Sequence, residues 1–234
     1  MKIKNLIFDL DNTLVNCGPY YTNKKKLFSQ TQAERTGFTS EFCQTLLEKI
    51  DVIFTSTPDG FSRNRFPRSF FAASIVMDVM SGNELDVDSA IDAYAIGESV
   101  FSEPYDAYEG VPEMLGRLAE KYNLFLLTKG DRDIQLKKVL NNQFHLYFPS
   151  KNIYVVAHKT SADLLHIMKE HQLNVDECLM IGDSPKDDIG AANGVKMRSV
   201  LVCDGSDKWE YENTNHKPTT KIPKVTDLEG LLEL

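Results

Sequence analysis

The sequence predicts an α/β protein with a doubly wound parallel sheet and a helical segment inserted after the first strand. Short apolar runs alternate with helical patterns in residues 1–16 and 106–234, which is typical of parallel strands joined by crossover helices. Residues 17–105 are polar, rich in aromatic side chains and patterned as helices, with no convincing strand. We therefore expect two domains, an α/β core formed by 1–16 and 106–234 and a helical insert formed by 17–105.

The composition is that of an ordinary globular chain, and it argues against several kinds of function. The net charge of −8 disfavours a nucleic-acid-binding surface, because binding a polyanion requires clustered cations. No apolar run approaches the ~20 residues of a membrane span, and no signal peptide is visible. The four cysteines are widely spaced, without a Cys-x-x-Cys pair, so we expect reduced thiols and a cytoplasmic location.

The first strand is expected over residues 2–8, and two carboxylates, Asp9 and Asp11, follow it. On an extended backbone, side chains two residues apart point to the same side. Asn12 and Thr13 then favour a turn. The two carboxylates are therefore expected where a parallel strand meets its loop, the usual place for a site in an open α/β sheet.

Four helices are expected in the insert, over about 21–35, 40–54, 67–80 and 88–101, with a turn at 57–60. Ser40 is the expected N-cap of the second helix. The third helix is expected to carry an apolar stripe of Phe70, Phe71, Ile75, Val79 and Met80, and the fourth runs through Ile91, Tyr94, Ala95 and Glu98. Near the start of the third helix lie Arg63, Arg65 and Arg68, which are either a solvated helix start or a contact for a second anionic group on a substrate.

The α/β alternation returns at Gly110. Strands are expected at 123–128, 153–157, 177–182 and 198–203, and helices at 112–121, 134–140, from 161 onward and at 185–192. Gly194 is expected to end the last of these helices in the left-handed conformation. Residues 204–220, which include Trp209, are expected to be irregular. An edge strand at 222–227 and a helix at 228–234 would complete a sheet of five or six parallel strands.

Polar residues follow several of these strands. Thr128-Lys129-Gly130 follows the second strand, Lys159 the third, and Asp183-Ser184-Pro185-Lys186-Asp187-Asp188 the fourth. Together with Asp9-Leu10-Asp11-Asn12-Thr13-Leu14, these segments resemble, in order, the four motifs of the haloacid dehalogenase superfamily, in its phosphatase branch. The first and fourth segments are specific, and the insert has the position of this superfamily's helical cap.

The resemblance implies a magnesium-dependent phosphatase that acts on a small phosphorylated metabolite. Asp9 resembles the nucleophile that forms an aspartyl-phosphate, and Asp11 resembles the general acid and base. Asp9, Asp183 and the backbone carbonyl of Asp11 are the implied Mg²⁺ ligands, and Asp188 would support them. Unit negative charges ~4 Å apart repel by about 4 kcal/mol at an effective dielectric constant of ~20, so clustered carboxylates and a phosphate require cations.

The same resemblance implies that Thr128 and Lys159 bind the substrate phosphate, and Lys129 is expected either to bind the substrate or to contact the helical insert. Two departures from the family pattern are visible. Lys129 stands where many relatives have Asn, which adds a positive charge, and no proline follows Lys159. His158 is expected to be structural rather than catalytic.

Three other functions remain open at this point. A phosphomutase would return the phosphoryl group to a substrate instead of losing it to water. A 2-haloacid dehalogenase is disfavoured by Asp11 and Asp183, because dehalogenases of this kind use neither the second Asp nor the metal. A non-catalytic binding module is disfavoured by the intact set of polar residues. The sequence identifies neither the substrate nor the choice between monomer and homodimer.

Overall fold

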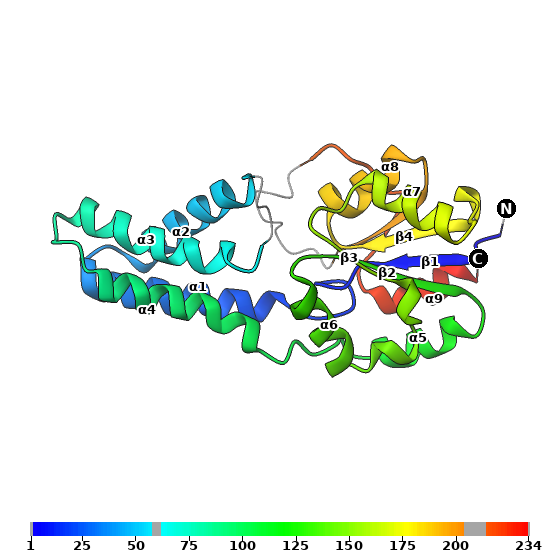
Figure 1. Ribbon diagram of the computed structural model, residues 1–234, viewed down its shortest axis with the longest axis horizontal. Coiled ribbons are helices and arrows are strands. Elements are labelled where there is room, and N and C mark those ends of the chain that lie inside the picture. The colour runs from blue at the N-terminus through cyan, green and yellow to red at the C-terminus, as the bar shows by residue number, and fades with distance from the viewer. Residues whose placement is uncertain (1, 58–61, 204–213, 234) are drawn as a thin grey trace. The chain divides into compact units, whose positions relative to one another are not determined.

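The computed structural model describes residues 2–57, 62–203 and 214–233, so most of the turn expected at 57–60 and all of Trp209 lie outside the described residues. The chain divides into two compact units (Figure 1). The α/β unit comprises the chain up to Asn16 and again from Tyr105 onward, and the helical unit comprises Cys17–Pro104.

The α/β unit contains a six-stranded parallel sheet in the order β3-β2-β1-β4-β5-β6, which confirms the predicted fold class. The strands are β1 (Asn5–Phe8), β2 (Asn123–Lys129), β3 (Ile153–Val156), β4 (Cys178–Gly182), β5 (Arg198–Val202) and β6 (Thr220–Ile222). The direction of winding reverses between β1 and β4, since β2 and β3 lie on one side of β1 and the later strands on the other. The edge strand thus precedes the expected range of 222–227, where a 3₁₀ turn (Val225–Asp227) leads into α9 (Leu228–Leu232).

Helices cover both faces of this sheet. Helices α7 (Ser161–Glu170) and α8 (Gly190–Gly194) lie on one face, and α5 (Val111–Ala119), α6 (Arg132–Asn141) and α9 lie on the other (Figure 1). Ile7 of β1 packs into a core shared with α7 and α8. Its neighbour Phe8 points to the opposite face, where its ring meets Phe148 edge-to-face at 6.1 Å. All four residues of β1 are buried, which requires both layers of helices.

The prediction for Gly194 is wrong. Gly194 is the last residue of α8, and the left-handed conformation is found instead at Lys196, with φ of 57°. A Cβ atom on Gly194 would lie only 2.0 Å from the Ser161 Oγ. That hydroxyl donates a hydrogen bond to the Ala191 carbonyl at 2.9 Å. Glycine is therefore present at position 194 to let the first turn of α7 pack directly on α8.

Within the α/β unit, the two chain segments that lead to and from the helical insert lie side by side. The Asn16 N–H donates to the Asp106 carbonyl at 2.9 Å, and Val15 forms an antiparallel bridge with Ala107. Asn142, which follows α6, donates from Nδ2 to the Tyr105 carbonyl at 2.8 Å and accepts from the Ala107 N–H at 2.7 Å. The chain therefore leaves and re-enters this unit at one place, fixed against α6.

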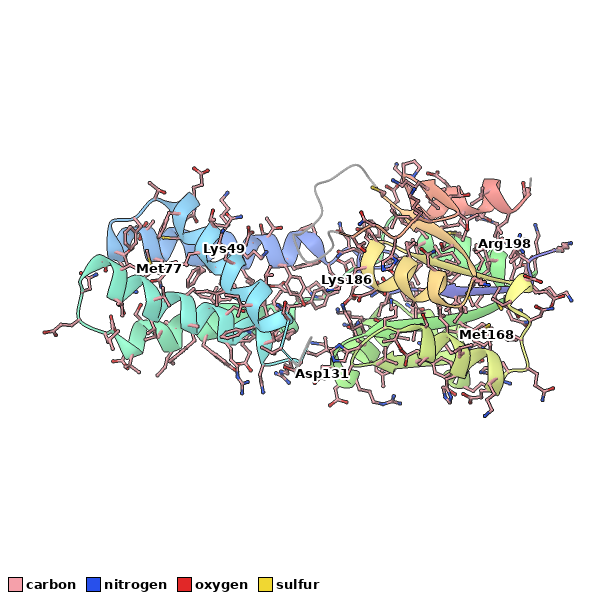
Figure 2. All side chains as sticks on the ribbon, turned by 90° about the horizontal axis from the view of Figure 1, so that it is seen from above. Lys49, Met77, Asp131, Met168, Lys186 and Arg198 are labelled. Atoms are coloured by element: carbon pink, nitrogen blue, oxygen red, sulfur yellow. The ribbon has the colours of Figure 1, made fainter. Side chains whose placement is uncertain are left out.

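The helical unit consists of α1 (Gly18–Thr36), α2 (Ser40–Thr55), α3 (Arg65–Ser81) and α4 (Val87–Glu98), with a 3₁₀ turn at Ser99–Ser102. Thr39, rather than Ser40, caps α2, and its side chain accepts a hydrogen bond from the Phe42 N–H. Met77 of α3, labelled in Figure 2, is fully buried in this unit. Among the described residues, no helix has both the length and the apolar character needed to cross a bilayer.

The apolar stripe predicted for α3 is only partly buried: Phe70 is fully buried, but the stripe residues nearer the C-terminal end of the helix are exposed. Val79 and Met80 are 66% and 52% exposed, and Ile91 is 54% exposed. The buried positions are mostly small or polar, and include Ala73, Ser74 and Asp78 in α3 and Ala90, Ala93 and Gly97 in α4. Apolar spacing does not locate these faces because it gives no weight to small side chains, which allow helices to approach closely, or to polar ones that find partners inside.

Gly97 is an example of a small residue that lets two helices approach closely, and Asp78 is an example of a polar residue with a buried partner. A Cβ atom on Gly97 would lie 2.9 Å from the Pro67 Cα, so glycine is needed where α4 crosses α3. The Asp78 carboxylate is fully buried because Arg35 of α1 forms an ion pair with it. Burial of a charged group requires such a partner.

Substituting Gly97→Ala should lower the free energy of unfolding by about 1–3 kcal/mol, because the added methyl group overpacks the α3–α4 contact. Gly116→Ala in α5 is the matched control. Its Cβ would lie 3.6 Å from Tyr147, an ordinary contact. Helix propensity alone should make this control neutral or more stable by up to about 1 kcal/mol. Urea denaturation followed by circular dichroism measures both, and equal effects would contradict the close-packing argument.

Candidate active site

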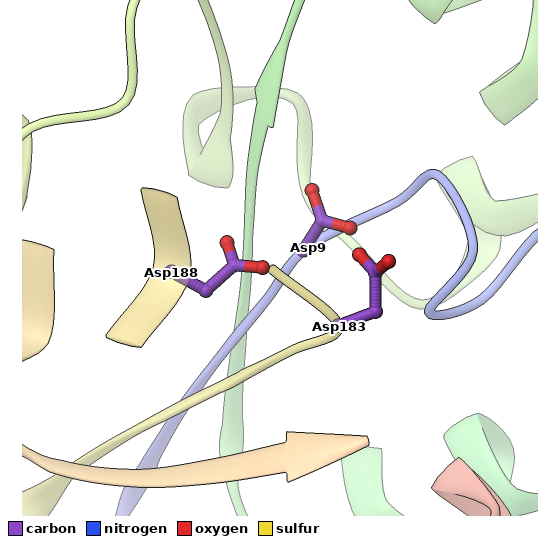
Figure 3. Close-up of side chains that lie close together, drawn as sticks. All are labelled: Asp9, Asp183 and Asp188. Atoms are coloured by element: carbon purple, nitrogen blue, oxygen red, sulfur yellow. The ribbon is translucent and has the colours of Figure 1, made fainter. Parts of the chain in front are cut away.

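Three carboxylates converge at the C-terminal ends of β1 and β4, where the winding of the sheet reverses. Asp9 directly follows β1, Asp183 directly follows β4, and Asp188 belongs to η5 (Pro185–Ile189), the turn after it. One oxygen from each side chain lies within 4.8 Å of the others, and the three groups point toward one another (Figure 3). In open α/β sheets, sites typically lie at the carboxyl ends of the strands where the strand order reverses.

The local sequence after β4 builds one side of this cluster. The Ile189 N–H donates to the Ser184 carbonyl at 3.2 Å, which widens the turn to a π-helical one. The Ser184 N–H in turn donates to Asp188 Oδ2 at 2.9 Å. A Cβ atom on Gly182 would lie 2.1 Å from that same oxygen. Glycine at position 182 is therefore required for the Asp188 carboxylate to occupy its place.

The Lys159 ammonium lies between two of the three carboxylates. Its Nζ is 2.6 Å from Asp9 Oδ1 and 2.5 Å from Asp188 Oδ1, and the lysine side chain is 2% exposed. The next residue, Thr160, caps α7 through a reciprocal pair of hydrogen bonds with Asp163. This capping box fixes the loop, although no proline follows the lysine.

The electrostatics of the cluster follow from burial. Burial raises the pKa of Asp9 to about 7; the Lys159 charge opposes this rise, while the charges of Asp188 and Asp11 reinforce it. Burial likewise raises the pKa of Asp188. Burial acts to lower the pKa of Lys159, but Asp188 and Asp9 together outweigh it, so the net shift is upward and the side chain stays an ammonium. One buried cation therefore faces more than one carboxylate.

The donor set fits a hard divalent cation. Asp9, Asp183 and Asp188 form the one group of three or more potential ligands found in the described part of the chain. All three offer carboxylate oxygens, which Mg²⁺ prefers, and a second positive charge would relieve the repulsion among them. The carboxylate of Asp11 is not a member of this group. Only the backbone carbonyl of Asp11 was predicted to bind the metal.

Gln135 and Lys138 of α6, which were not predicted from the sequence, hold the Asp11 side chain. The Lys138 Nζ is 2.8 Å from each carboxylate oxygen of Asp11, and the Gln135 Nε2 is 3.1 Å from Oδ2. Both α6 residues are 2% exposed. They are three residues apart and share the buried face of the helix with Val139. No sequence pattern identifies this face, because the apolar Leu140 of the same helix is exposed while these two polar residues are buried.

The other predicted substrate-binding residues lie at the same end of the sheet, at the end of β2. Thr128 is fully buried, and its hydroxyl oxygen accepts a hydrogen bond from the Gln135 Nε2 at 2.6 Å. Lys129 forms an ion pair with Asp187, and each of these side chains is 13% exposed. Lys129 and Asp187 thus neutralise each other beside the carboxylate cluster.

The three arginines near the start of α3 differ from one another. Arg65 is 9% exposed, forms an ion pair with Asp51 and donates to the Thr55 hydroxyl at 2.9 Å. The Arg65 charge is paired with Asp51 and joins α2 to α3. Arg65 therefore fits neither of the two expected roles, a solvated helix start or a contact for a substrate anion. Arg68 is exposed, and Arg63 lies 3.6 Å from Glu98.

Comparisons with known proteins agree on a single family. The model of the haloacid dehalogenase-like hydrolases matches residues 3–195. A haloacid dehalogenase-like family hydrolase from Xanthomonas campestris superposes with a TM-score of 0.75 at 19% identity, over 99% of this chain and 91% of that one. A putative HAD-hydrolase, YfnB from Bacillus subtilis, bound to magnesium, gives 0.68 at 16% identity over 100% of both chains.

Other matching structures have different described activities. A 2-haloacid dehalogenase from Pseudomonas syringae gives a TM-score of 0.59 at 20% identity, over 99% of this chain and 98% of that one. Proteins described as a phosphatase from Thermococcus onnurineus and a putative beta-phosphoglucomutase from Thermotoga maritima match at 16% and 15% identity. Identities this low show a shared fold and leave the reaction open. The search of curated proteins found no match.

In metal-free protein, the free energy of unfolding should fall as the pH rises from about 4 to about 7, because the folded state retains protons that the unfolded chain releases. In the folded protein the pKa of Asp9 is raised to about 7, and the pKa of Asp188 is raised as well. Each proton retained in this window contributes a slope of up to about 1.4 kcal/mol per pH unit. Urea unfolding with a chelator at a series of pH values measures this slope.

Asp9→Asn should reduce that slope, because the substituted side chain does not titrate. Asp92→Asn, at an exposed position of α4, is the matched control and should leave the slope as in wild type. A slope that is the same in the Asp9→Asn variant and the wild type would contradict the assignment of the buried titrating group.

Proposed function

Because the chain belongs to the haloacid dehalogenase-like hydrolase family, we propose that it is a magnesium-dependent phosphatase that hydrolyses a small phosphomonoester through an aspartyl-phosphate on Asp9. The observation that supports this most is the combination of two separate acidic groups. One is the Asp9, Asp183 and Asp188 cluster around Lys159, and the other is Asp11, which is held apart from that cluster by α6.

In the first step, an oxygen of Asp9 attacks the phosphorus atom, and the bond from phosphorus to the departing alcohol oxygen breaks. Asp11 donates a proton to that oxygen, which leaves as a neutral alcohol. The product is a mixed anhydride between the Asp9 carboxyl group and the phosphoryl group. Splitting the hydrolysis in this way replaces one difficult displacement by two easier ones.

In the second step, Asp11, now a carboxylate, accepts a proton from a water molecule as its oxygen attacks phosphorus. The bond between phosphorus and the Asp9 oxygen breaks, so that inorganic phosphate leaves and the Asp9 carboxylate is restored. Asp11 regains the proton that it gave up in the first step. The protons and the phosphoryl group are therefore balanced over one cycle.

The remaining residues bind and neutralise the phosphoryl group. The Lys159 ammonium, already between Asp9 and Asp188, would stabilise the charge that develops on the transferring oxygens. The Thr128 hydroxyl accepts from Gln135, so its own proton can be donated to a phosphate oxygen. When bound by Asp9, Asp183 and Asp188, Mg²⁺ would supply further positive charge and orient the phosphate.

Two alternatives within the fold are separable by their products. A 2-haloacid dehalogenase would need neither Asp11 nor Asp183, whereas the proposed phosphatase uses Asp11, which Lys138 contacts, and Asp183, which lies in the carboxylate cluster. A phosphomutase would use the same residues as a phosphatase and differ only in the fate of the aspartyl-phosphate. Release of inorganic phosphate, as opposed to transfer to a second position on a substrate, distinguishes these two reactions.

Purified protein should release phosphate from p-nitrophenyl phosphate when Mg²⁺ is present, and Asp9→Asn should abolish this activity because the nucleophile is lost. A chelator should remove the activity, and added Mg²⁺ should restore it. Asp92→Asn again serves as the matched control and should retain wild-type activity. Activity that a chelator does not affect, or chloride release from 2-chloropropionate without phosphate release, would contradict the proposal.

Asp11→Asn should lower kcat by about 10²–10⁴, the usual contribution of a positioned general acid or base, with a much smaller change in KM. The amide can neither donate the proton to the alcohol nor accept one from water. Steady-state kinetics with an alkyl phosphate, whose leaving group most needs protonation, measure this effect. Unchanged kcat would exclude Asp11 from proton transfer.

A further inference from the structure

The buried contact between α6 and Asp11 has no role in the mechanism above. Building on the phosphatase proposed there, we infer that Lys138 and Gln135 are positioning residues that fix the Asp11 carboxylate in the orientation needed for proton transfer. Gln135 also joins Asp11 to the phosphate-binding Thr128. This assignment adds two residues from α6 to a site otherwise built from segments that follow the strands.

Lys138 is placed as a two-point holder of the Asp11 side chain. Its Nζ lies 2.8 Å from Oδ1 and 2.8 Å from Oδ2, so the carboxylate cannot rotate without losing one of these bonds. The ring of Tyr105, buried beside it, faces the same ammonium at 4.4 Å from its centroid. A cation over an aromatic face is stabilised, more so when water is excluded. The lysine is therefore held from two directions.

Gln135 connects three parts of the site through one amide nitrogen. Its Nε2 lies 3.1 Å from Asp11 Oδ2, 2.6 Å from the Thr128 hydroxyl and 3.1 Å from the Lys129 carbonyl oxygen. Asp11 and Thr128 come from the first and second motif segments, which are far apart in the sequence. The shared amide therefore sets the position of the proton-transfer group relative to a group that binds phosphate.

Asp11 needs such support more than Asp9 does. Its side chain is 32% exposed, whereas that of Asp9 is 8% exposed and is fixed by Lys159. Asp11 also lies in the loop beyond β1, next to Asn12, whose φ is 58°. A displacement of about 1 Å can cost about 10²-fold in rate. A partly exposed loop carboxylate that transfers protons therefore gains most from rigid partners on a helix.

Lys138→Met, which keeps the length and removes the charge, should lower kcat by about 10- to 100-fold, the loss expected when the proton-transfer group is misplaced. KM for the phosphomonoester should change far less, since Lys138 holds Asp11, the group assigned to proton transfer. Lys138→Arg, which can hold both carboxylate oxygens, should recover most of the lost kcat. Lys137→Met, at the adjacent exposed position of α6, is the matched control and should behave as wild type.

The decisive measurement is a double-mutant cycle with Asp11→Asn. If Lys138 acts through the Asp11 carboxylate, Lys138→Met should cause little further loss of kcat in the Asp11→Asn background. Equal losses in both backgrounds would show that the lysine merely supports the fold, and would overturn the inference. If Lys138→Met does not fold, as judged by circular dichroism, the same cycle with Gln135→Met decides by the same criterion.

The outcome also separates this inference from the proposed function. Wild-type protein without phosphatase activity would overturn the proposed function. Active wild-type protein, with Lys138→Met equal to Lys137→Met in kcat and KM, would overturn the positioning role alone.

Discussion

The ion pairs of Lys159 with Asp9 and Asp188 are the interactions on which the site depends. Burying an isolated carboxylate is costly, and two close carboxylates also repel each other. An ammonium within 2.6 Å of one and 2.5 Å of the other offsets much of both costs. Lys159 therefore stabilises the folded site itself, and in the proposed reaction the same charge would stabilise the transferring phosphoryl group.

Sheet topology explains why these groups can meet at all. β1 and β4 are neighbours in the sheet, although most of the chain separates them in sequence. Their parallel register pairs Phe8 with Ile181, so the residues that follow emerge side by side at one edge. Helices on both faces leave this edge as the place where polar side chains can gather. The positions of Asp9 and Asp183 are therefore consequences of strand order as much as of local sequence.

Sequence alone predicted the fold class and most of the clustered residues, because strand ends and polar motifs are local features. The convergence of Asp9 with Asp183 follows from a parallel sheet in which β1 and β4 are neighbours. Gln135 and Lys138 were missed because a helical pattern does not show whether a polar residue has a buried partner. Their partner, Asp11, is identified only by the tertiary structure. Likewise, no local pattern shows that Arg65 is buried, since its partner Asp51 lies on another helix.

The faces of the helical unit were missed for a related reason. Periodicity favoured large apolar residues such as Val79, which is 66% exposed, over the small or polar residues that line the actual contacts. Gly97 permits an approach that larger residues would prevent, and a buried ion pair compensates Asp78. Helix packing in this unit is therefore governed by steric fit and charge pairing, neither of which a hydrophobic pattern records.

The contact between Gly194 and Ser161 links the end of α8 to the beginning of α7, two residues after Lys159. A larger residue at position 194 would push against the Ser161 hydroxyl, 2.0 Å from where a Cβ would lie, and so against the turn that holds the ammonium. Such a change would be tolerated most easily together with loss of that hydroxyl. Residues 161 and 194 should therefore change together among related sequences. Their steric fit supports the turn that carries Lys159, the cation between Asp9 and Asp188.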